Sequence, residues 1–348
     1  MPDLRPLRNL LTDRIHALPL VVVYLTDGCN SRCATCDIWK VPRRNMSLAL
    51  AERLAADCAA LGVRRVVLSG GEAMQHPEWP RIATLFRAAG ARVTLLTNGL
   101  LLNKQADAVR ASIDDLTVSL DGGTPETYQA IRGVDGFALI LEGMRACAGL
   151  PITTRTTLQR ANFREMPQII DAAKSVGAAK ISFLAVDVSN REAFGPRFAD
   201  LAANYATEHA PLSPALTADE LPEFAEMLDR LERDYAADFA SGRLAESPAK
   251  LRRLHRYFAA LNGITIFDPP RCNAPHVSAV IEVDGSLRPC FFLPKVGTLA
   301  DHGVNQPLRS ALNSTDAIAM RAAYRAGERP ECERCVCALY QSPRALIR

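Results

Sequence analysis

Residues 20–36 read Leu-Val-Val-Val-Tyr-Leu-Thr-Asp-Gly-Cys-Asn-Ser-Arg-Cys-Ala-Thr-Cys, an apolar run followed at once by Cys29, Cys33 and Cys36. A short run of apolar, β-branched residues predicts a buried strand, so the cysteines lie on the loop that leaves its end. Iron–sulfur clusters are normally held by four thiolates. A loop that supplies three leaves one iron without a protein ligand, and a substrate or cofactor can bind there.

Zinc, disulfides and unmodified thiols are the alternatives for this CxxxCxxC loop. Structural zinc sites usually show two CxxC or CxxH pairs, and a single triplet does not match that spacing. Disulfides are rare in a reducing compartment. We therefore favour an iron–sulfur cluster.

The composition indicates a globular protein with one large domain and a smaller one. The chain has 348 residues, 48% of them hydrophobic, and its 41 Lys and Arg nearly balance its 38 Asp and Glu. Both signs are scattered, so we expect neither nucleic acid nor a membrane surface as a partner. Residues 1–6 do not resemble a signal peptide, and no uncharged apolar run is long enough to span a membrane. A cytoplasmic location is the expectation.

Between residues 19 and 187, short β-branched runs alternate with amphipathic stretches, which is typical of βα units and a parallel sheet. Six such units predict a partial (β/α)6 barrel of the TIM type, two units short of a closed one. Ser47 and Asn162 are expected helix N-caps. The expected strands are Val21–Thr26, Arg64–Ser69, Arg92–Thr97, Asp115–Leu120, Ile152–Leu158 and Lys180–Ala185. The expected helices are Ser47–Leu61, Glu78–Ala89, Ala106–Ser112, Gly136–Cys147 and Phe163–Val176.

In barrels of this kind the functional groups lie at the carboxyl ends of the strands. The second strand ends in Gly70, Gly71 and Glu72, where paired glycines let another group approach the backbone closely. On its own this sequence is also a common turn.

The next strand ends include further polar groups. Asn98 follows the third strand, and Ser119 and Asp121 share one face at the end of the fourth, although Asp-Gly there is also a plain turn. Arg155 lies within the fifth strand and would need an anion if it were buried.

The cysteine loop, the Gly-Gly-Glu turn one unit later and the Val-Ser-Leu-Asp-Gly strand together resemble the radical S-adenosylmethionine (radical SAM) superfamily. The resemblance implies that Cys29, Cys33 and Cys36 hold a [4Fe-4S] cluster whose open iron binds S-adenosylmethionine (SAM). It also implies that Glu72 and its glycines contact the SAM amino group. The chain departs from the usual pattern in two places, with Thr35 where an aromatic residue precedes the third cysteine and Ala73 where a proline follows the glutamate.

A second cysteine set lies in the C-terminal part of the chain. Asp284-Gly285 predicts a hairpin between strands 277–283 and 287–293. The pattern Cys-x12-Gly-x4-Cys with a later CxxC resembles the auxiliary-cluster regions called SPASM and Twitch, and it implies one auxiliary [4Fe-4S] cluster; zinc is the alternative. Two other cysteines, Cys58 and Cys147, are expected to be packed thiols. The candidate auxiliary ligands are Cys272, Cys290, Cys332, Cys335 and Cys337, one of which is spare.

These expectations divide the chain into four parts: an N-terminal extension (1–18), the partial barrel (19–187), a helical bridge (188–262) and a small hairpin-plus-helix auxiliary-cluster domain (263–348). A capping box at Thr217 and Glu220 opens the main bridge helix.

The implied activity is cleavage of SAM to a 5′-deoxyadenosyl radical that abstracts hydrogen from a substrate, with dehydrogenation ahead of epimerisation or decarboxylation. The short segment before Cys29 favours a small-molecule substrate such as a sugar, aminoglycoside or nucleoside-like compound. An external reductant, flavodoxin or ferredoxin, is a further expected partner. The alternatives are a peptide-modifying maturase and a non-catalytic iron–sulfur or zinc protein. Tyr24 and Arg155 are candidate catalytic residues, and Asp187 and Asp268 are further candidates for proton transfer.

Overall fold

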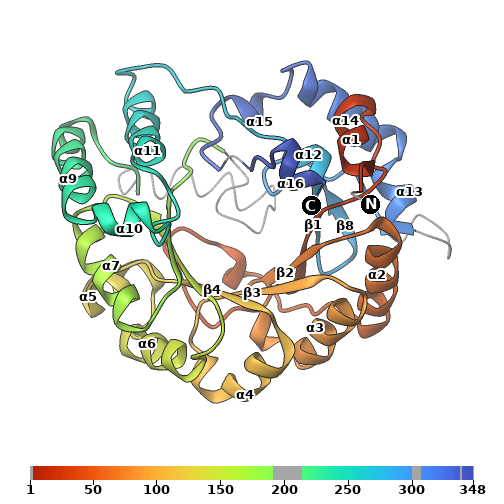
Figure 1. Cartoon of the computed structure of the whole chain (residues 1–348), viewed down its shortest axis with the longest axis horizontal. Helices are drawn as coiled ribbons and strands as arrows, with labels where there is room; N and C mark the ends of the chain where they lie inside the picture. The colour runs from red at the N-terminus through yellow and green to blue at the C-terminus, as the bar shows by residue number, and fades with distance from the viewer. Residues whose placement is uncertain (1–2, 191–213, 300–306, 338, 348) are drawn as a thin grey trace.

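The computed structural model describes residues 3–190, 214–299, 307–337 and 339–347. Six parallel strands follow one another in chain order around an open barrel, with helices on the outside (Figure 1). The predicted partial barrel is confirmed. The strands are β1 Leu20–Thr26, β2 Arg65–Gly70, β3 Arg92–Thr97, β4 Asp115–Ser119, β5 Ile152–Leu158 and β6 Lys180–Ala185.

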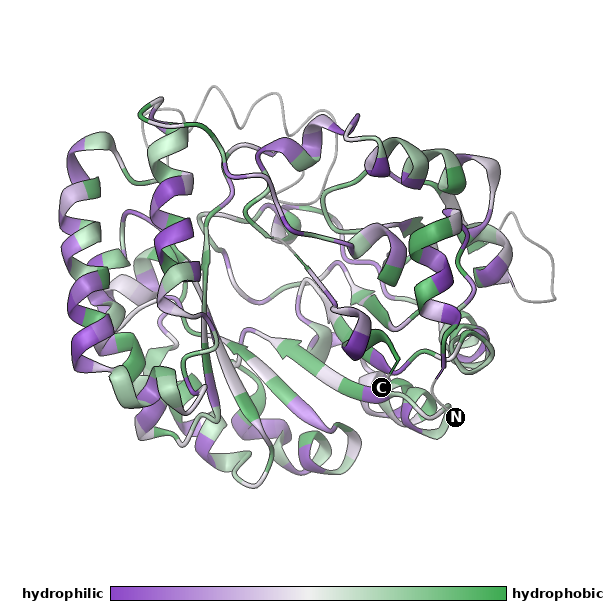
Figure 2. Cartoon of the chain, turned by 45° about the horizontal axis from the view of Figure 1, so that its top comes forward, coloured by the Kyte–Doolittle hydropathy of each residue, from purple (hydrophilic) through white to green (hydrophobic). Residues whose placement is uncertain are grey.

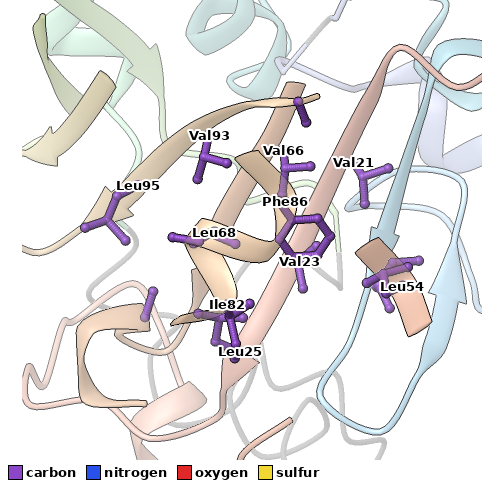
Figure 3. Close-up of a cluster of buried hydrophobic side chains, with 14 of the residues drawn as sticks. Val21, Val23, Leu25, Leu54, Val66, Leu68, Ile82, Phe86, Val93 and Leu95 are labelled. Carbon is purple, nitrogen blue, oxygen red and sulfur yellow. The ribbon is translucent and has the colours of Figure 1, made fainter. Parts of the chain in front are cut away.

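The outer face of the sheet carries the main hydrophobic core. Val23, Leu68 and Leu95 are fully buried there and pack with Ile82 and Phe86 of the covering helices (Figure 3). Burial of each such side chain contributes roughly 1.5–3 kcal/mol. The barrel strands contain hydrophobic stretches, whereas the outer helices carry hydrophilic and hydrophobic residues side by side (Figure 2).

The helices over the barrel agree with the predicted ones within a few residues. Ser47 caps α2 as expected, because its side chain accepts a hydrogen bond from the Leu50 N–H. Asn162 does not cap a helix: its side-chain oxygen accepts from the Gln159 N–H (2.9 Å), and its amide donates to the Asp121 and Thr157 carbonyls. The elements are η1 Ile38–Lys40, α2 Leu48–Leu61, η2 Ala73–Gln75, α3 Trp79–Ala88, α4 Leu102–Ser112, α5 Pro125–Arg132, α6 Phe137–Ala146, η3 Phe163–Glu165 and α7 Met166–Ser175.

The predicted C-terminal hairpin exists, but it extends the barrel sheet rather than forming a sheet of its own. β7 (Ser278–Ile281) pairs parallel to β1, β8 (Ser286–Arg288) pairs antiparallel to β7, and β9 (Gly297–Thr298) follows. The second strand of the hairpin is shorter than predicted and ends just before Pro289, since proline has no N–H to donate to a ladder.

The remaining helices surround the open side of the barrel. The bridge contains the predicted capping box, in which the Glu220 carboxylate accepts from the Thr217 N–H (2.9 Å). No described helix is long and apolar enough to cross a membrane. The elements are α1 Arg5–Thr12, η5 Ala218–Glu220, α9 Leu221–Asp234, α10 Ala236–Ala240, α11 Pro248–Leu261, α12 Ala274–Val277, α13 Pro307–Leu312, α14 Thr315–Arg325, α15 Pro330–Glu333 and α16 Pro343–Leu346.

Candidate cluster and cofactor site

The end of β2 holds one side of the cysteine loop. The Gly71 N–H donates to the Thr26 carbonyl (2.7 Å), and the Glu72 N–H donates to the Gly28 carbonyl (2.8 Å). A Cβ at position 71 would lie 2.3 Å from the Gly28 oxygen, and one at position 70 would lie 2.4 Å from the Thr26 oxygen. The paired glycines are therefore needed for the close approach of β2 to the loop.

The C-terminal end of α5 holds the other side. The Arg32 N–H donates to the Arg132 carbonyl (3.0 Å), and the Ala34 N–H donates to the Ile131 carbonyl (2.9 Å). Gly133 adopts φ +68° and lies so close to Arg32 that a Cβ would be 2.3 Å from its carbonyl oxygen. The loop is thus fixed by backbone groups from two elements that are far apart in the sequence.

Asn98 supplies a third contact to the loop, from the end of β3. Its side-chain amide donates to Asn30 Oδ1 (2.7 Å) and Ser31 Oγ (3.1 Å), and its Nδ2 lies 3.8 Å from Cys29 Sγ. The structure therefore places this predicted site residue directly against the cysteines.

The three cysteines form no disulfide and are partly buried, so their thiols are free to bind a cluster. Burial raises the pKa of Cys29 and Cys33 above the ordinary value, and it raises that of Cys36 to about 12. A bound cluster would reverse this preference, because a coordinating thiol is deprotonated outright. Burial that disfavours free thiolates and a single loop that carries three sulfurs fit a cluster with one open iron.

The Glu72 carboxylate, predicted to contact SAM, is used inside the protein. It is almost completely buried and accepts hydrogen bonds from the Asn98 N–H (2.7 Å), the Thr97 hydroxyl (2.8 Å) and the Met74 N–H (3.1 Å). Burial raises its pKa, and these donors oppose the rise. The side chain joins the ends of β2 and β3, which positions the turn that holds the cysteine loop.

Asp121 also has a structural partner rather than a free face. Its carboxylate pairs with Arg132 at 3.0 Å and accepts from the Thr157 N–H at 2.7 Å, and the residue is 4% exposed. Burial raises the pKa of Asp121, and the Arg132 guanidinium opposes that rise. The positive charge of Arg132 also acts on the Cys33 thiol. Both carboxylate oxygens therefore have a partner inside the protein, and a contact of Asp121 with the cofactor stays a prediction.

Ser119, Arg155 and Tyr24 lie on the inner face of the barrel. Ser119 pairs in register with Arg155, and Tyr24 pairs with Ser69. Arg155 is exposed, so the cost of burying its charge, on which the prediction of an anionic partner rested, does not arise. Burial of the Cys337 sulfur raises the pKa of that thiol, and the positive charge of Arg155 opposes the rise.

The C-terminal cysteines come together from separate segments. Negative charge on Cys272 or Cys332 would raise the pKa of Cys290, and negative charge on Cys337 or Cys272 would raise that of Cys335. Burial raises the pKa of Cys290 to about 12 and that of Cys332 to about 11. Cys272 thus influences the pKa of Cys290, Cys332 and Cys335 alike.

Side-chain hydrogen bonds join these segments. The Tyr324 hydroxyl donates to the Cys272 carbonyl (2.7 Å), and Asn273 exchanges two hydrogen bonds with the backbone of Gln341 (2.8 and 2.9 Å). Cys58 and Cys147, by contrast, are buried in the hydrophobic core, which confirms that they are packed thiols.

Among the described residues, no three Cys, His, Asp or Glu side chains converge closely enough to hold one metal ion.

Comparison with known proteins agrees with this geometry. Residues 23–173 match the radical SAM superfamily, and residues 272–336 match the SPASM iron–sulfur cluster-binding domain. The chain thus contains a radical SAM domain followed by a SPASM-type region. A radical SAM domain binds a [4Fe-4S] cluster and SAM, and the SPASM domain adds auxiliary iron–sulfur binding, so the predicted cofactors are confirmed.

Individual relatives are similar over part of the chain. It is 34% identical over 171 residues to an AdoMet-dependent heme synthase of Methanosarcina barkeri, which covers 47% of this chain and 49% of the relative. It is 31% identical over 203 residues to a PqqA peptide cyclase of Streptomyces rochei, a match that covers 55% of this chain and 56% of the relative. The chain spans about half the length of these curated relatives. The crystal structure of Streptococcus suis SuiB bound to S-adenosylmethionine aligns with a TM-score of 0.62 at 15% identity, covering 96% of this chain and 76% of that one, which shows the shared fold.

Two features of the site were missed by sequence analysis. Arg132 was not predicted as a site residue, although its guanidinium is buried beside Cys33 and Asp121. Asn30 and Ser31, which both accept hydrogen bonds from the Asn98 side chain, were not predicted either. The segment Tyr128–Gly133 resembles one that is common after the fourth strand in the superfamily, and this resemblance is the sequence signal that could have pointed to Arg132.

Proposed function

We propose that this protein is a radical SAM enzyme that removes a hydrogen atom from a small organic substrate, with dehydrogenation as the net reaction. The observation that carries the proposal is the position of the cysteine loop. Backbone hydrogen bonds from the end of β2 and from α5, together with the Asn98 side chain, hold the loop. The loop lies at the carboxyl ends of the barrel strands, where barrels of this kind place their functional groups.

The residues of the chain then have distinct roles. Cys29, Cys33 and Cys36 would hold the cluster that, when reduced, supplies the electron for cleavage of SAM. The turn at Gly71 presents its backbone to the SAM amino group, because the Glu72 carboxylate is already occupied. Ser119 and Arg155 lie side by side on the inner face of the barrel and would bind and orient the polar parts of SAM or substrate.

The auxiliary cysteines support a redox role. Arg155 acts electrostatically on Cys337, so the inner face of the barrel and the C-terminal site lie within reach of each other. Cys272, Cys290, Cys332 and Cys335 would hold a fully ligated cluster, which could take up the electron that the substrate radical loses, together with a proton, as it becomes the dehydrogenated product. Flavodoxin or ferredoxin would supply the electron for SAM cleavage.

The test uses anaerobically reconstituted protein. We expect about eight irons per chain, corresponding to two four-iron clusters, and formation of 5′-deoxyadenosine from SAM with dithionite. About four irons would remove the auxiliary cluster from the proposal. Full iron content without 5′-deoxyadenosine, with and without candidate substrates, would contradict the enzymatic function.

A peptide substrate is the second candidate, and one observation favours it. Two relatives that match over 203 residues are named as PqqA peptide cyclases, at 31% and 26% identity, while other relatives are named for heme and for GTP. Co-expression with short peptides encoded near this protein, followed by mass spectrometry, separates the two. A mass change that requires intact Cys33 would establish the peptide substrate.

A further inference from the structure

A pocket of about 250 Å³ lies between α11 and the C-terminal tail, away from the loop of Cys29, Cys33 and Cys36. The segment that joins α11 to α12 forms its third side. One of its lining residues is Cys335, a candidate ligand of the auxiliary cluster. The full lining is Lys250, Arg253, Leu254, Tyr257, Phe267, Asp268, Arg271, Arg334, Cys335, Val336 and Tyr340.

The charges of this pocket are strongly unbalanced, with four cations against one carboxylate. That carboxylate, Asp268, is already paired with Arg256 of α11 at 2.7 Å and lies 4.0 Å from Arg253. Lys250 has its own partner in Glu246 at 3.5 Å. Two of the four pocket cations, Lys250 and Arg253, therefore have carboxylate neighbours, which leaves Arg271 and Arg334.

Arg271 and Arg334 are held in a different way. The guanidinium of Arg271 lies 4.1 Å from the ring centre of Tyr340, and that of Arg334 lies 5.5 Å from the ring of Phe267. Neither has a carboxylate partner within the part of the chain that the structure describes. Stacking on an aromatic face leaves the N–H groups at the edge of a guanidinium free to bind an oxyanion, often in pairs.

Arg271 and Arg334 directly precede Cys272 and Cys335 in the sequence. Both guanidinium groups lie over aromatic rings, so they form a positively charged rim above aromatic walls, an arrangement that suits an anionic ligand.

The pocket also connects to the barrel. The hydroxyl of Tyr257, one of its walls, donates to the Asp187 carboxylate (3.2 Å) just after β6. The second oxygen of this buried carboxylate has no hydrogen-bond partner among the described residues. A ligand seated in the pocket would therefore lie close to both the auxiliary cysteine and the carboxyl end of the last barrel strand.

We propose that this pocket binds the phosphate or carboxylate group of a small anionic ligand, with Arg271 and Arg334 as the anion-binding residues and the aromatic walls against its apolar part. The volume suits one small ring or one end of a larger molecule rather than the flat surface of a protein partner. A cationic ligand would be repelled by the four basic side chains. If the proposed function holds, this ligand is the substrate, which would then carry an acidic group.

Calorimetric titration of the anaerobically reconstituted protein at low salt tests the proposal with three probes: phenyl phosphate, benzoate and benzylamine. We expect one or both anions to bind and benzylamine not to bind. The anion that binds tighter distinguishes a phosphate from a carboxylate ligand. Arg271→Gln and Arg334→Gln should each weaken the affinity at least tenfold, whereas Arg271→Lys should weaken it less. Arg230→Gln, which removes the same charge from an exposed pair on α9, should leave it unchanged.

A second measurement tests the position of the site. In the Cys33→Ala variant only the auxiliary cluster remains, and the bound anion should change its electron paramagnetic resonance spectrum. No anion binding, equal binding of benzylamine, unchanged affinity in both glutamine variants, or an unchanged spectrum would each overturn the proposal. Binding does not require SAM cleavage, so anion binding without 5′-deoxyadenosine would contradict the proposed function alone.

Discussion

The loop of Cys29, Cys33 and Cys36 is one short segment fixed by neighbouring backbone, whereas the auxiliary cysteines are brought together from three segments by side chains. In the first region the carbonyls of Thr26, Gly28 and Arg132 take part in the hydrogen bonds that hold the loop. In the second, the Tyr324 hydroxyl and the Asn273 amide make the connections. The first site is thus positioned by the barrel itself, and the second depends more on its own ligands.

The largest effect is expected from Cys33→Ala. Loss of one of three ligands on a single loop should abolish the first cluster, lowering iron from about eight to about four per chain, and should abolish 5′-deoxyadenosine formation. Iron analysis and chromatography of the SAM products measure both. Cys147→Ala, which removes a packed core thiol, is the matched control and should retain both properties. Unchanged iron in the Cys33 variant would contradict the assignment of the first site.

The auxiliary region is tested by comparing Cys335→Ala with Cys337→Ala. The SPASM match ends at residue 336, so we expect Cys337 to be the spare thiol. The Cys335 variant should lose about four irons per chain, and the Cys337 variant should lose none. The first cluster should remain in both, as judged by 5′-deoxyadenosine formed without substrate. The reverse pattern of iron loss would make Cys337 the ligand.

In the first region, Arg132→Gln is expected to lower the free energy of unfolding, an effect smaller than the loss of a cluster. The change leaves the Asp121 carboxylate buried without its ion-pair partner, and breaking a buried pair in this way costs about 3–5 kcal/mol. Thermal and denaturant unfolding under anaerobic conditions measure the loss. Arg110→Gln removes a charge from an exposed pair and should cost far less. Equal losses in the two variants would show that the Asp121 pair does not support the loop.

Sequence analysis succeeded where the deciding information was local. The alternation of β-branched and amphipathic runs gave β1–β6 nearly to the residue, and the spacing of Cys29, Cys33 and Cys36 gave the cluster loop. It failed where partners are distant in the chain. Arg132 lies about a hundred residues from the loop that it holds, and no local pattern shows that its carbonyl and its charge both face that loop.

The same limit applies to the second region. The Asp284-Gly285 turn predicted a hairpin, but nothing local indicates that β7 pairs with β1 and so continues the barrel sheet. Likewise, the cofactor contacts predicted for Glu72 and Asp121 rested on their position at strand ends and stay predictions. No local pattern showed that both carboxylates also accept hydrogen bonds within the protein, from the Asn98 N–H and from Thr157 and Arg132.

The smallest expected effect concerns pH and the attachment of the auxiliary region to α1. His276 of α12 lies 2.9 Å from the Asp13 carboxylate, and burial lowers the pKa of His276 below its ordinary value of 6.5. Asp13 also pairs with Arg325, which with Arg321 further disfavours a second positive charge on the imidazole. The negative charge of Asp13 therefore does not outweigh the burial of His276.

The sign of the pH dependence follows from this lowered pKa. As pH falls below about 6.5, the unfolded chain binds a proton at His276 that the folded chain does not, so stability is lost with decreasing pH until the folded-state pKa is reached. Between pH 8 and 5.5, the Tm of the wild type should decrease more than that of His276→Gln, by a small margin. His16→Gln, at a half-buried histidine shortly after Asp13 in the sequence, is the control and should follow the wild type. Parallel curves for wild type and His276→Gln would mean that the imidazole does not titrate with unfolding. A difference confined to the auxiliary cluster's retention of iron would show that this contact holds the second region to the barrel without affecting the first.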